Sequence, residues 1–182
     1  MDRAIAEKRL KIVRDHMEAE NALDFDAAIG TFNHPRYELV ATGQIFDGVE
    51  GVQDYSRRSR AAFPDQNNEL ISLRLAGDDA IISEFWLMGT NKRPPSAPMG
   101  KIPPTGKSFR VRMCAVFEFE DEKIVCERLY FDSMSLMRQL TGGDPQNYRH
   151  FDLRSFVQFT ARFACAGAQS HRDRLQSTRK RR

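Results

Sequence analysis

The stretch Tyr130–Leu140 reads YFDSMSLMRQL, and it joins the end of a strand to the start of a short helix. Asp132 lies at the joint, where its side chain can cap the first turn of the helix. A carboxylate in this place can also serve as the acid or base of a reaction. The two roles do not exclude each other, and the residue alone does not choose between them.

Upstream of this joint, the chain predicts several strands preceded by helices. Residues 109–118 alternate, with apolar side chains on one face at Phe109, Val111, Met113, Ala115 and Phe117. Strands are also expected at 69–77, 79–91 and 123–131, and shorter ones near 37–42 and 43–46. Amphipathic helices are expected at 3–20, 25–32 and 48–62. Helices grouped before consecutive strands predict an α+β fold with a mostly antiparallel sheet.

The last strand departs from clean alternation. One face carries Val125, Glu127, Leu129 and Phe131, so a single carboxylate lies among three apolar side chains. Such a violation of the pattern is typical of a rim or of a functional site.

Length and composition indicate one compact domain with an extension. The 182 residues are 41% hydrophobic and 29% charged, which is ordinary for a globular protein. We expect a domain over 1–142 and an extension over 143–182. In the extension, Phe151, Phe156, Phe159 and Phe163 are spaced as on one helix, predicted over about 151–167, and a basic, disordered tail follows.

The distribution of charge argues against a nucleic-acid-binding domain. Nine basic and three acidic residues lie in 143–182, so this segment carries a net charge of +6 and the preceding 142 residues carry −3. The terminal RKRR has no interleaved aromatic residues, and we interpret it as a solvated end. No apolar run is long enough to span a bilayer, so no membrane partner is expected.

The cysteines indicate a reducing compartment. Cys114, Cys126 and Cys165 are odd in number and form no CxxC pair, which predicts neither a disulfide framework nor a zinc site. The N-terminus lacks the apolar core of a signal peptide. We therefore expect a cytoplasmic protein, and we expect no metal site.

Several short segments together resemble the SnoaL-like polyketide cyclases, a family with the nuclear-transport-factor-2-like fold. They are HPRYE (34–38), FPD (63–65), GT (89–90), IPPTGK (102–107), FEDEKI (119–124) and YFDSMSLMRQL (130–140). The resemblance implies a strongly curved sheet that forms a cone, wrapped by the N-terminal helices, with an apolar pocket inside. It also implies a homodimer with no metal or organic cofactor.

The resemblance also shows where this chain departs from the anthracycline-type cyclases of the family. Their acid/base aspartate falls on Leu129, and their partner histidine falls on Ala115. Neither leucine nor alanine can transfer a proton. If the chain performs chemistry, it uses a shifted set of groups.

Three residues are candidates for that chemistry, and each has a structural alternative. Asp132 and Glu127 lie on or next to the last strand, where burial in a cone would raise the pKa of a carboxylate. The alternative for Glu127 is a structural pairing with Arg110 or Arg112 on the neighbouring strand, or with a residue of a helix. His34 could shuttle a proton, or its side chain could stabilise the turn before Pro35.

The pocket itself is expected to be hydrophobic. The residues that we expect to bind the substrate are Tyr37, Trp86, Met113, Ala115, Phe117, Leu129 and Tyr130, although Trp86 could equally be a core residue.

Two functions are compatible with these features. The first is a cofactor-free isomerase, cyclase, lyase or hydrolase that acts on a small, apolar, oxygenated substrate. The second is a non-catalytic module that uses the same cone to bind a hydrophobic ligand or a protein partner. A third possibility concerns the phenylalanine-rich segment 151–167, which could block or complete the pocket.

Overall fold

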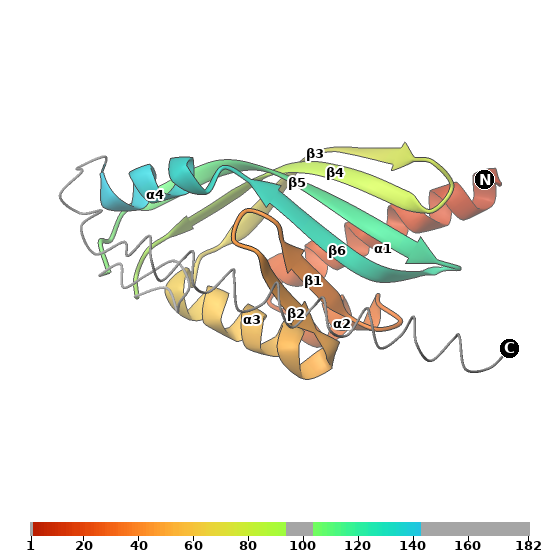
Figure 1. The fold of residues 1–182 in the computed structure, drawn as a ribbon, viewed down its shortest axis with the longest axis horizontal. Coiled ribbons are helices and arrows are strands. Elements are labelled where there is room, and N and C mark those ends of the chain that lie inside the picture. Colours follow the sequence, from red (N-terminus) through yellow and green to blue (C-terminus); the bar gives the residue numbers. More distant parts are fainter. Residues whose placement is uncertain (1, 94–103, 143–182) are drawn as a thin grey trace, which may run out of the picture.

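A computed structural model describes residues 2–93 and 104–142 of the chain (Figure 1). The predicted extension over 143–182, including the phenylalanine-rich segment 151–167, lies outside the described residues. The elements, in chain order, are α1 (Arg3–Asn21), α2 (Phe25–Gly30), β1 (Arg36–Leu39), β2 (Gln44–Asp47), α3 (Gly48–Ala62), β3 (Asn67–Ala76), β4 (Ala80–Thr90), β5 (Ser108–Glu120), β6 (Lys123–Phe131) and α4 (Ser133–Thr141).

The strands form one sheet in the order β2-β1-β6-β5-β4-β3. Every neighbouring pair is antiparallel except β1 and β6, which run parallel. Figure 1 shows the sheet curving over α3, with α1 on the same side. The predicted α+β fold with a mostly antiparallel sheet is confirmed.

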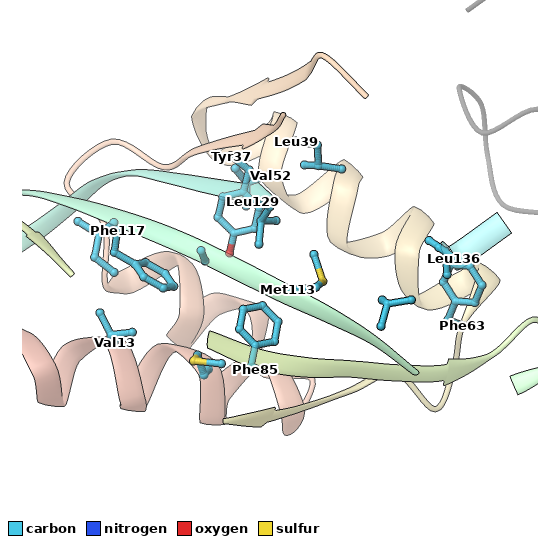
Figure 2. Packing of buried hydrophobic residues seen from close by; sticks show 14 of the residues in the cluster. Val13, Tyr37, Leu39, Val52, Phe63, Phe85, Met113, Phe117, Leu129 and Leu136 are labelled. Atoms are coloured by element: carbon cyan, nitrogen blue, oxygen red, sulfur yellow. The ribbon is translucent and has the colours of Figure 1, made fainter. Parts of the chain in front are cut away.

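The inner face of the sheet and the helices enclose one hydrophobic core. Figure 2 shows side chains of α1, α3, β1 and β4–β6 meeting there, among them Val13, Val52, Phe85 and Met113. Phe117 and Tyr37 are buried at the centre of this cluster. The alternation predicted for β5 is confirmed, because Phe109, Val111, Met113, Ala115 and Phe117 are all buried.

A β-bulge explains the imperfect alternation of β6. Phe119 pairs with Ile124, whereas Glu118 pairs with Cys126, so Val125 is an extra residue. Ile124 therefore lies inward together with Glu127, although simple alternation would place them on opposite faces. The face predicted for Glu127, Leu129 and Phe131 is correct, whereas Val125 and Ile124 exchange places.

Helix α1 directs polar as well as apolar side chains toward the core. Asp2 caps it by accepting a hydrogen bond from the backbone N–H of Ala4 at 3.0 Å. Its buried face comprises Ala6, Arg9, Val13, His16 and Met17. The Arg9 guanidinium donates to the carbonyl oxygen of Asp121 at 2.9 Å, and thereby fastens α1 to the β5–β6 turn.

Helix α4 is defined at both ends by capping residues. Both oxygens of Asp132 accept hydrogen bonds from its first turn, and Gly142 ends the helix with a φ of 78°, which favours glycine. None of the helices in the described ranges is long and apolar enough to cross a membrane.

Candidate functional site

Two adjoining chambers lie between the inner face of the sheet and the helices. The apolar chamber, of about 110 Å³, is bounded mostly by aliphatic and aromatic side chains, including Leu39, Phe46, Phe63, Phe109, Phe131 and Leu136. The polar chamber, of about 30 Å³, is bounded by the polar residues Glu20, Tyr55, Ser56, Arg60, Asn68 and Glu127, together with several apolar ones. The two chambers share Tyr55, Ser59, Gln66, Leu87, Met113 and Leu129, so they adjoin each other and are together called the cavity.

A buried histidine and two carboxylates form the charged end of this cavity. His16 on α1 is fully buried, and its Nε2 lies 3.4 Å from Oε2 of Glu127 on β6. The same Nε2 lies 3.7 Å from Oε1 of Glu20, one helical turn further along α1. Because residues i and i+4 share a helix face, His16 and Glu20 both point toward the strand that carries Glu127.

The hydroxyl of Tyr37 connects the histidine to Glu20. It lies 3.2 Å from His16 Nε2 and donates a hydrogen bond to Glu20 Oε1, also at 3.2 Å. Since the hydroxyl donates to Glu20, it is available as an acceptor for an Nε2–H group. Burial raises the pKa of Tyr37 well above its ordinary value, and the charges of Glu20 and Glu127 add to that increase.

The hydrogen-bond partners of His16 favour the doubly protonated imidazolium. Nδ1 lies 3.2 Å from the carbonyl oxygen of Ala28, which can only accept, so Nδ1 carries a proton. Nε2 faces two carboxylates, so it carries a proton as well. Burial alone would lower the pKa of His16, but the Glu127 carboxylate beside Nε2 and the charge of Glu20 outweigh burial and raise it to about 9.

Glu127 is the carboxylate whose protonation is most strongly affected by this environment. It is only 3% exposed. Burial raises its pKa, the negative charge of Glu20 raises it further, and His16 opposes both effects. The result is a carboxylate with increased basicity beside an imidazolium, a combination common among groups that transfer protons.

Arg60 and Asn68 complete the polar chamber. Arg60 on α3 donates to the carbonyl oxygen of Glu20 at 2.7 Å and also to that of Gln66, and burial lowers its pKa. The side-chain amide of Asn68 on β3 donates to Glu20 Oε2 at 2.9 Å. These bonds hold α1, α3 and β3 together around the Glu20 carboxylate.

The three ionisable groups are also close enough to bind a cation. One ligand atom from each of His16, Glu20 and Glu127 lies within 4.8 Å of the other two. Binding of a metal ion would displace the proton from Nε2, so proton and metal would compete for the same nitrogen.

Comparison with known proteins identifies the family. The family model of SnoaL-like polyketide cyclases matches residues 11–140, which is most of the chain. The chain belongs to the SnoaL-like polyketide cyclase family. No curated protein matches the sequence.

Solved structures show the fold that this SnoaL-like chain shares with distant relatives. TsrD from Streptomyces laurentii is 23% identical, with a TM-score of 0.61 over 77% of this chain and 97% of TsrD. An NTF2-like protein from Burkholderia thailandensis is 21% identical, with a TM-score of 0.61 over 72% of this chain and 96% of that protein. A protein of ketosteroid isomerase-like fold from Catenulispora acidiphila, in complex with trimethylamine, is 21% identical, with a TM-score of 0.59 over 71% of this chain and 92% of that protein.

The structure places the two positions that correspond to the cyclase acid and histidine opposite each other. Ala115 on β5 and Leu129 on β6 are paired residues, and both are buried. In this SnoaL-like chain both positions are apolar, and Leu129 borders both chambers. Glu127 lies one inward-facing position before Leu129 on the same strand.

Several of the residues predicted to bind substrate lie at or next to the cavity. Met113 and Leu129 border both chambers. Ala115 is buried in the sheet, where it pairs with Leu129 and lies two residues after Met113 on β5. Phe117 and Tyr37 pack edge-on against His16, with ring centroids 5.7 Å and 6.2 Å away, so they surround the charged cluster instead of bordering a chamber.

Trp86 and Tyr130 lie on the outer face of the sheet, and the structure does not bring them to the cavity. Alternation along β4 directs Phe85 inward and Trp86 outward, where the Arg110 guanidinium stacks on its ring at 4.0 Å. Tyr130 pairs with Cys114 on the same outer face and is 40% exposed. Arg112, considered above as a partner of Glu127, pairs instead with Glu84 at 2.8 Å.

Asp132 and His34 also lie away from the cavity. One oxygen of Asp132 accepts hydrogen bonds from the backbone N–H groups of Met134 and Ser135, and the other accepts from the Ser135 hydroxyl at 2.5 Å. The hydrogen bonds from Ser135 hold the pKa of Asp132 below its ordinary value. His34 is exposed in its turn and lies 3.3 Å from Asp47.

Sequence reasoning missed most of the polar residues of the polar chamber and its cluster. They include His16, Glu20, Tyr55, Ser56, Arg60 and Asn68. A signal was present in α1, because His16 and Glu20 continue the helical face started by Arg9 and Val13. Polar residues at such positions of a core-facing helix indicate a buried polar network.

Proposed function

We propose that this chain is a small-molecule enzyme that performs acid/base chemistry on an apolar, oxygenated substrate held in the two chambers. Glu127 accepts or donates the proton, and His16 controls the charge on Glu127. The proposal is supported by membership of the SnoaL-like family and by the position of the charged cluster at one end of an apolar cavity.

The observation that carries the proposal is the burial of Glu127 beside His16. A carboxylate in water is too weak a base for most carbon acids, and removing it from water raises its basicity. Glu127 is almost fully buried, its pKa is raised by burial, and its side chain borders the polar chamber. Proton transfer of this kind is a shared step of isomerases, cyclases and lyases, and it requires no organic cofactor.

The proposal can be tested without knowing the natural substrate. 5-Nitrobenzisoxazole opens to a coloured cyanophenolate when a base removes its ring C–H proton and the N–O bond breaks. We expect the wild-type chain to accelerate this reaction, and we expect Glu127→Gln to slow it by about 100-fold or more, since a positioned base contributes at least this much. Glu69→Gln is the matched control, because Glu69 is an exposed carboxylate paired with Arg110 on the outer face.

The melting temperature of each variant is measured in parallel with the rate. A Glu127→Gln variant that keeps the wild-type rate would contradict the assignment of the base. A wild-type chain no faster than acetate at equal concentration would contradict the enzyme proposal itself.

The apolar pair of Ala115 and Leu129 supports a second candidate function, a non-catalytic binding module. Both positions that correspond to the proton-transferring groups of the anthracycline-type cyclases are inert here. Tight binding of apolar compounds by the wild-type chain, together with no ring opening of 5-nitrobenzisoxazole, would favour this function over the first.

We also propose that the chain forms a homodimer through the outer face of its sheet. This face presents Tyr130 at 40% exposure and the Arg110–Trp86 stack. Size-exclusion chromatography with light scattering is expected to give twice the 20.9 kDa chain mass. Tyr130→Glu is expected to shift the protein toward the monomer, and a wild-type monomer at micromolar concentration would contradict the proposal.

A further inference from the structure

Two residues that border the polar chamber each have a buried oxygen atom that accepts no hydrogen bond from any described residue. The two atoms are Glu127 Oε2 and Asn68 Oδ1. Glu127 Oε2 lies 3.4 Å from His16 Nε2, at ion-pair distance but without hydrogen-bond geometry. Buried acceptors in folded proteins are almost always satisfied, so two of them on residues that border one small chamber point to a ligand group.

The orientation of the Asn68 amide is fixed by its neighbour. Its Nδ2 donates to Glu20 Oε2 at 2.9 Å, and a flipped amide would place two acceptor oxygens against each other. Oδ1 is therefore the atom left for a ligand. Asn68 is also held through its backbone, because its N–H donates to the Asn21 side chain at 2.7 Å and its carbonyl oxygen accepts from the same side chain at 2.9 Å.

The donors that surround the chamber are largely engaged elsewhere. Arg60 donates to the backbone carbonyl oxygens of Glu20 and Gln66, and the Ser56 hydroxyl donates to the carbonyl oxygen of Val52 at 3.0 Å. Two acceptors are therefore open to a hydrogen-bond donor, and a hydroxyl group meets this requirement.

The balance of charge selects a neutral donor. Glu20 and Glu127 contribute two negative charges, whereas the His16 imidazolium and Arg60 contribute two positive charges. A ligand carboxylate or phosphate would lie against Glu127 and Asn68 Oδ1 and would be repelled. An ammonium group would add an unbalanced positive charge in a buried site.

The size of the two chambers suggests how such a ligand is divided between them. About 30 Å³ is sufficient for a hydroxyl group or one water molecule, and the adjoining apolar chamber of about 110 Å³ accepts a hydrophobic body. We propose that Glu127 Oε2 and Asn68 Oδ1 together recognise the hydroxyl of an apolar alcohol or phenol, with Asn68 as a specificity-determining residue. This inference rests on the proposed function, because it assigns a substrate class to the same cavity.

Calorimetric titration of the full chain at pH 7 with three two-ring probes tests the inference. The probes are 2-naphthol, its methyl ether 2-methoxynaphthalene, and 2-naphthoate. We expect 2-naphthol to bind about tenfold more tightly than the methyl ether, because the ether cannot donate to either oxygen. We expect 2-naphthoate to bind most weakly of the three.

Substitutions at neighbouring asparagines locate the preference. In Asn68→Ala, the ratio of the two affinities is expected to fall to about threefold or less, while the affinity for the methyl ether stays unchanged. Asn67→Ala is the matched control, since Asn67 is the exposed neighbour on the same strand, and it is expected to keep the wild-type ratio. If Asn68→Ala fails to fold, the comparison of the three probes on the wild-type chain still decides the question.

A crystal structure with 2-naphthol separates the two sources of a hydroxyl donor, the ligand and water. We expect the naphthol oxygen within hydrogen-bond distance of Glu127 Oε2 and Asn68 Oδ1, in the place of a water molecule seen without the ligand. A water molecule that remains there when 2-naphthol is bound would overturn the inference. So would equal affinities for alcohol and ether, tighter binding of 2-naphthoate, or no binding of 2-naphthol up to its solubility limit.

These binding measurements are independent of turnover. If the alcohol preference holds and Glu127→Gln leaves the opening of 5-nitrobenzisoxazole unchanged, then the proposed catalytic role fails while the recognition of hydroxyl groups stands. The reverse pattern would leave the base in place and would remove only the substrate class.

Discussion

The raised pKa of His16 predicts that the stability of the protein falls as the solution is made alkaline from neutral pH. The pKa rises from 6.5 to about 9 in the folded state, because the ion pairs with Glu127 and Glu20 outweigh the effect of burial. The folded chain therefore binds this proton more tightly than the unfolded chain does. The associated stability is fully present below about pH 6.5 and is lost as the pH rises through about 9.

The structure sets the magnitude of this effect. A difference of about 2.5 pH units between the folded and unfolded pKa values corresponds to about 3 kcal/mol in the free energy of unfolding. The raised pKa of Glu127 acts in the same direction, starting from the ordinary value of 4.5. Burial raises the pKa values of Cys114 and Cys126 from 9.0, so their contribution begins where this window ends.

Urea unfolding of the full chain at several pH values between 6 and 9 measures the effect. We expect the wild-type free energy of unfolding to decline by about 3 kcal/mol across this range, and we expect His16→Gln to remove most of the decline. Because His16→Gln leaves two carboxylates without a cation, the double variant with Glu127→Gln provides a second, better balanced comparison. A wild-type value that is constant between pH 6.5 and 9, or a slope that persists in both variants, would refute the reasoning.

Three further predictions concern single residues. Asp132→Ala is expected to lower the melting temperature, because it removes the capping oxygens of α4. Asp132→Ser, which preserves a capping oxygen, is expected to keep the melting temperature near the wild-type value. Loss of 5-nitrobenzisoxazole opening at an unchanged melting temperature would instead support a role for Asp132 in catalysis. Leu129→Ala is expected to lower the free energy of unfolding by about 2–3 kcal/mol. This is the low end for a buried leucine, because the side chain borders the cavity. An unchanged free energy of unfolding in urea would contradict the packing of Leu129. Tyr37→Phe is expected to lower the free energy of unfolding by about 1 kcal/mol and to alter the pKa of His16 in an NMR titration. A His16 titration identical to that of the wild type would contradict the hydrogen bond between Tyr37 and His16.

The sequence predicts the fold because each element carries its own local signal. The alternation of β5 and the periodicity of α3 depend on residues close together in the chain, and both elements occupy the predicted positions. The joint at Asp132 behaves in the same way, since its hydrogen bonds reach only two and three residues ahead.

The site is harder to predict because its parts are distant in the chain. His16 and Glu127 are separated by more than one hundred residues, and no local pattern in α1 indicates that its polar face meets β6. Alternation also cannot tell which face of a strand becomes the inside, so the sequence predicts Trp86 in the pocket or the core although it lies on the outer face. Tyr130 follows Leu129 directly, so the two face opposite sides of β6 and only Leu129 lies inside. The pairing of Ala115 with Leu129, in contrast, follows from two positions that the family resemblance connects.

The bulge at Val125 makes the chemistry of this protein depend on a count of residues as well as on their identity. If Val125 were instead absorbed into a regular ladder with Ile124 held inward, Glu127 would turn outward and the interior would lose its carboxylate. Deletion of Val125 would have the opposite effect, because Ile124 and Glu127 would then be two positions apart and both would still face inward. The buried carboxylate therefore depends on the parity of the residue count in β6, and protein engineers who straighten this strand must remove the extra residue and not merely suppress the bulge.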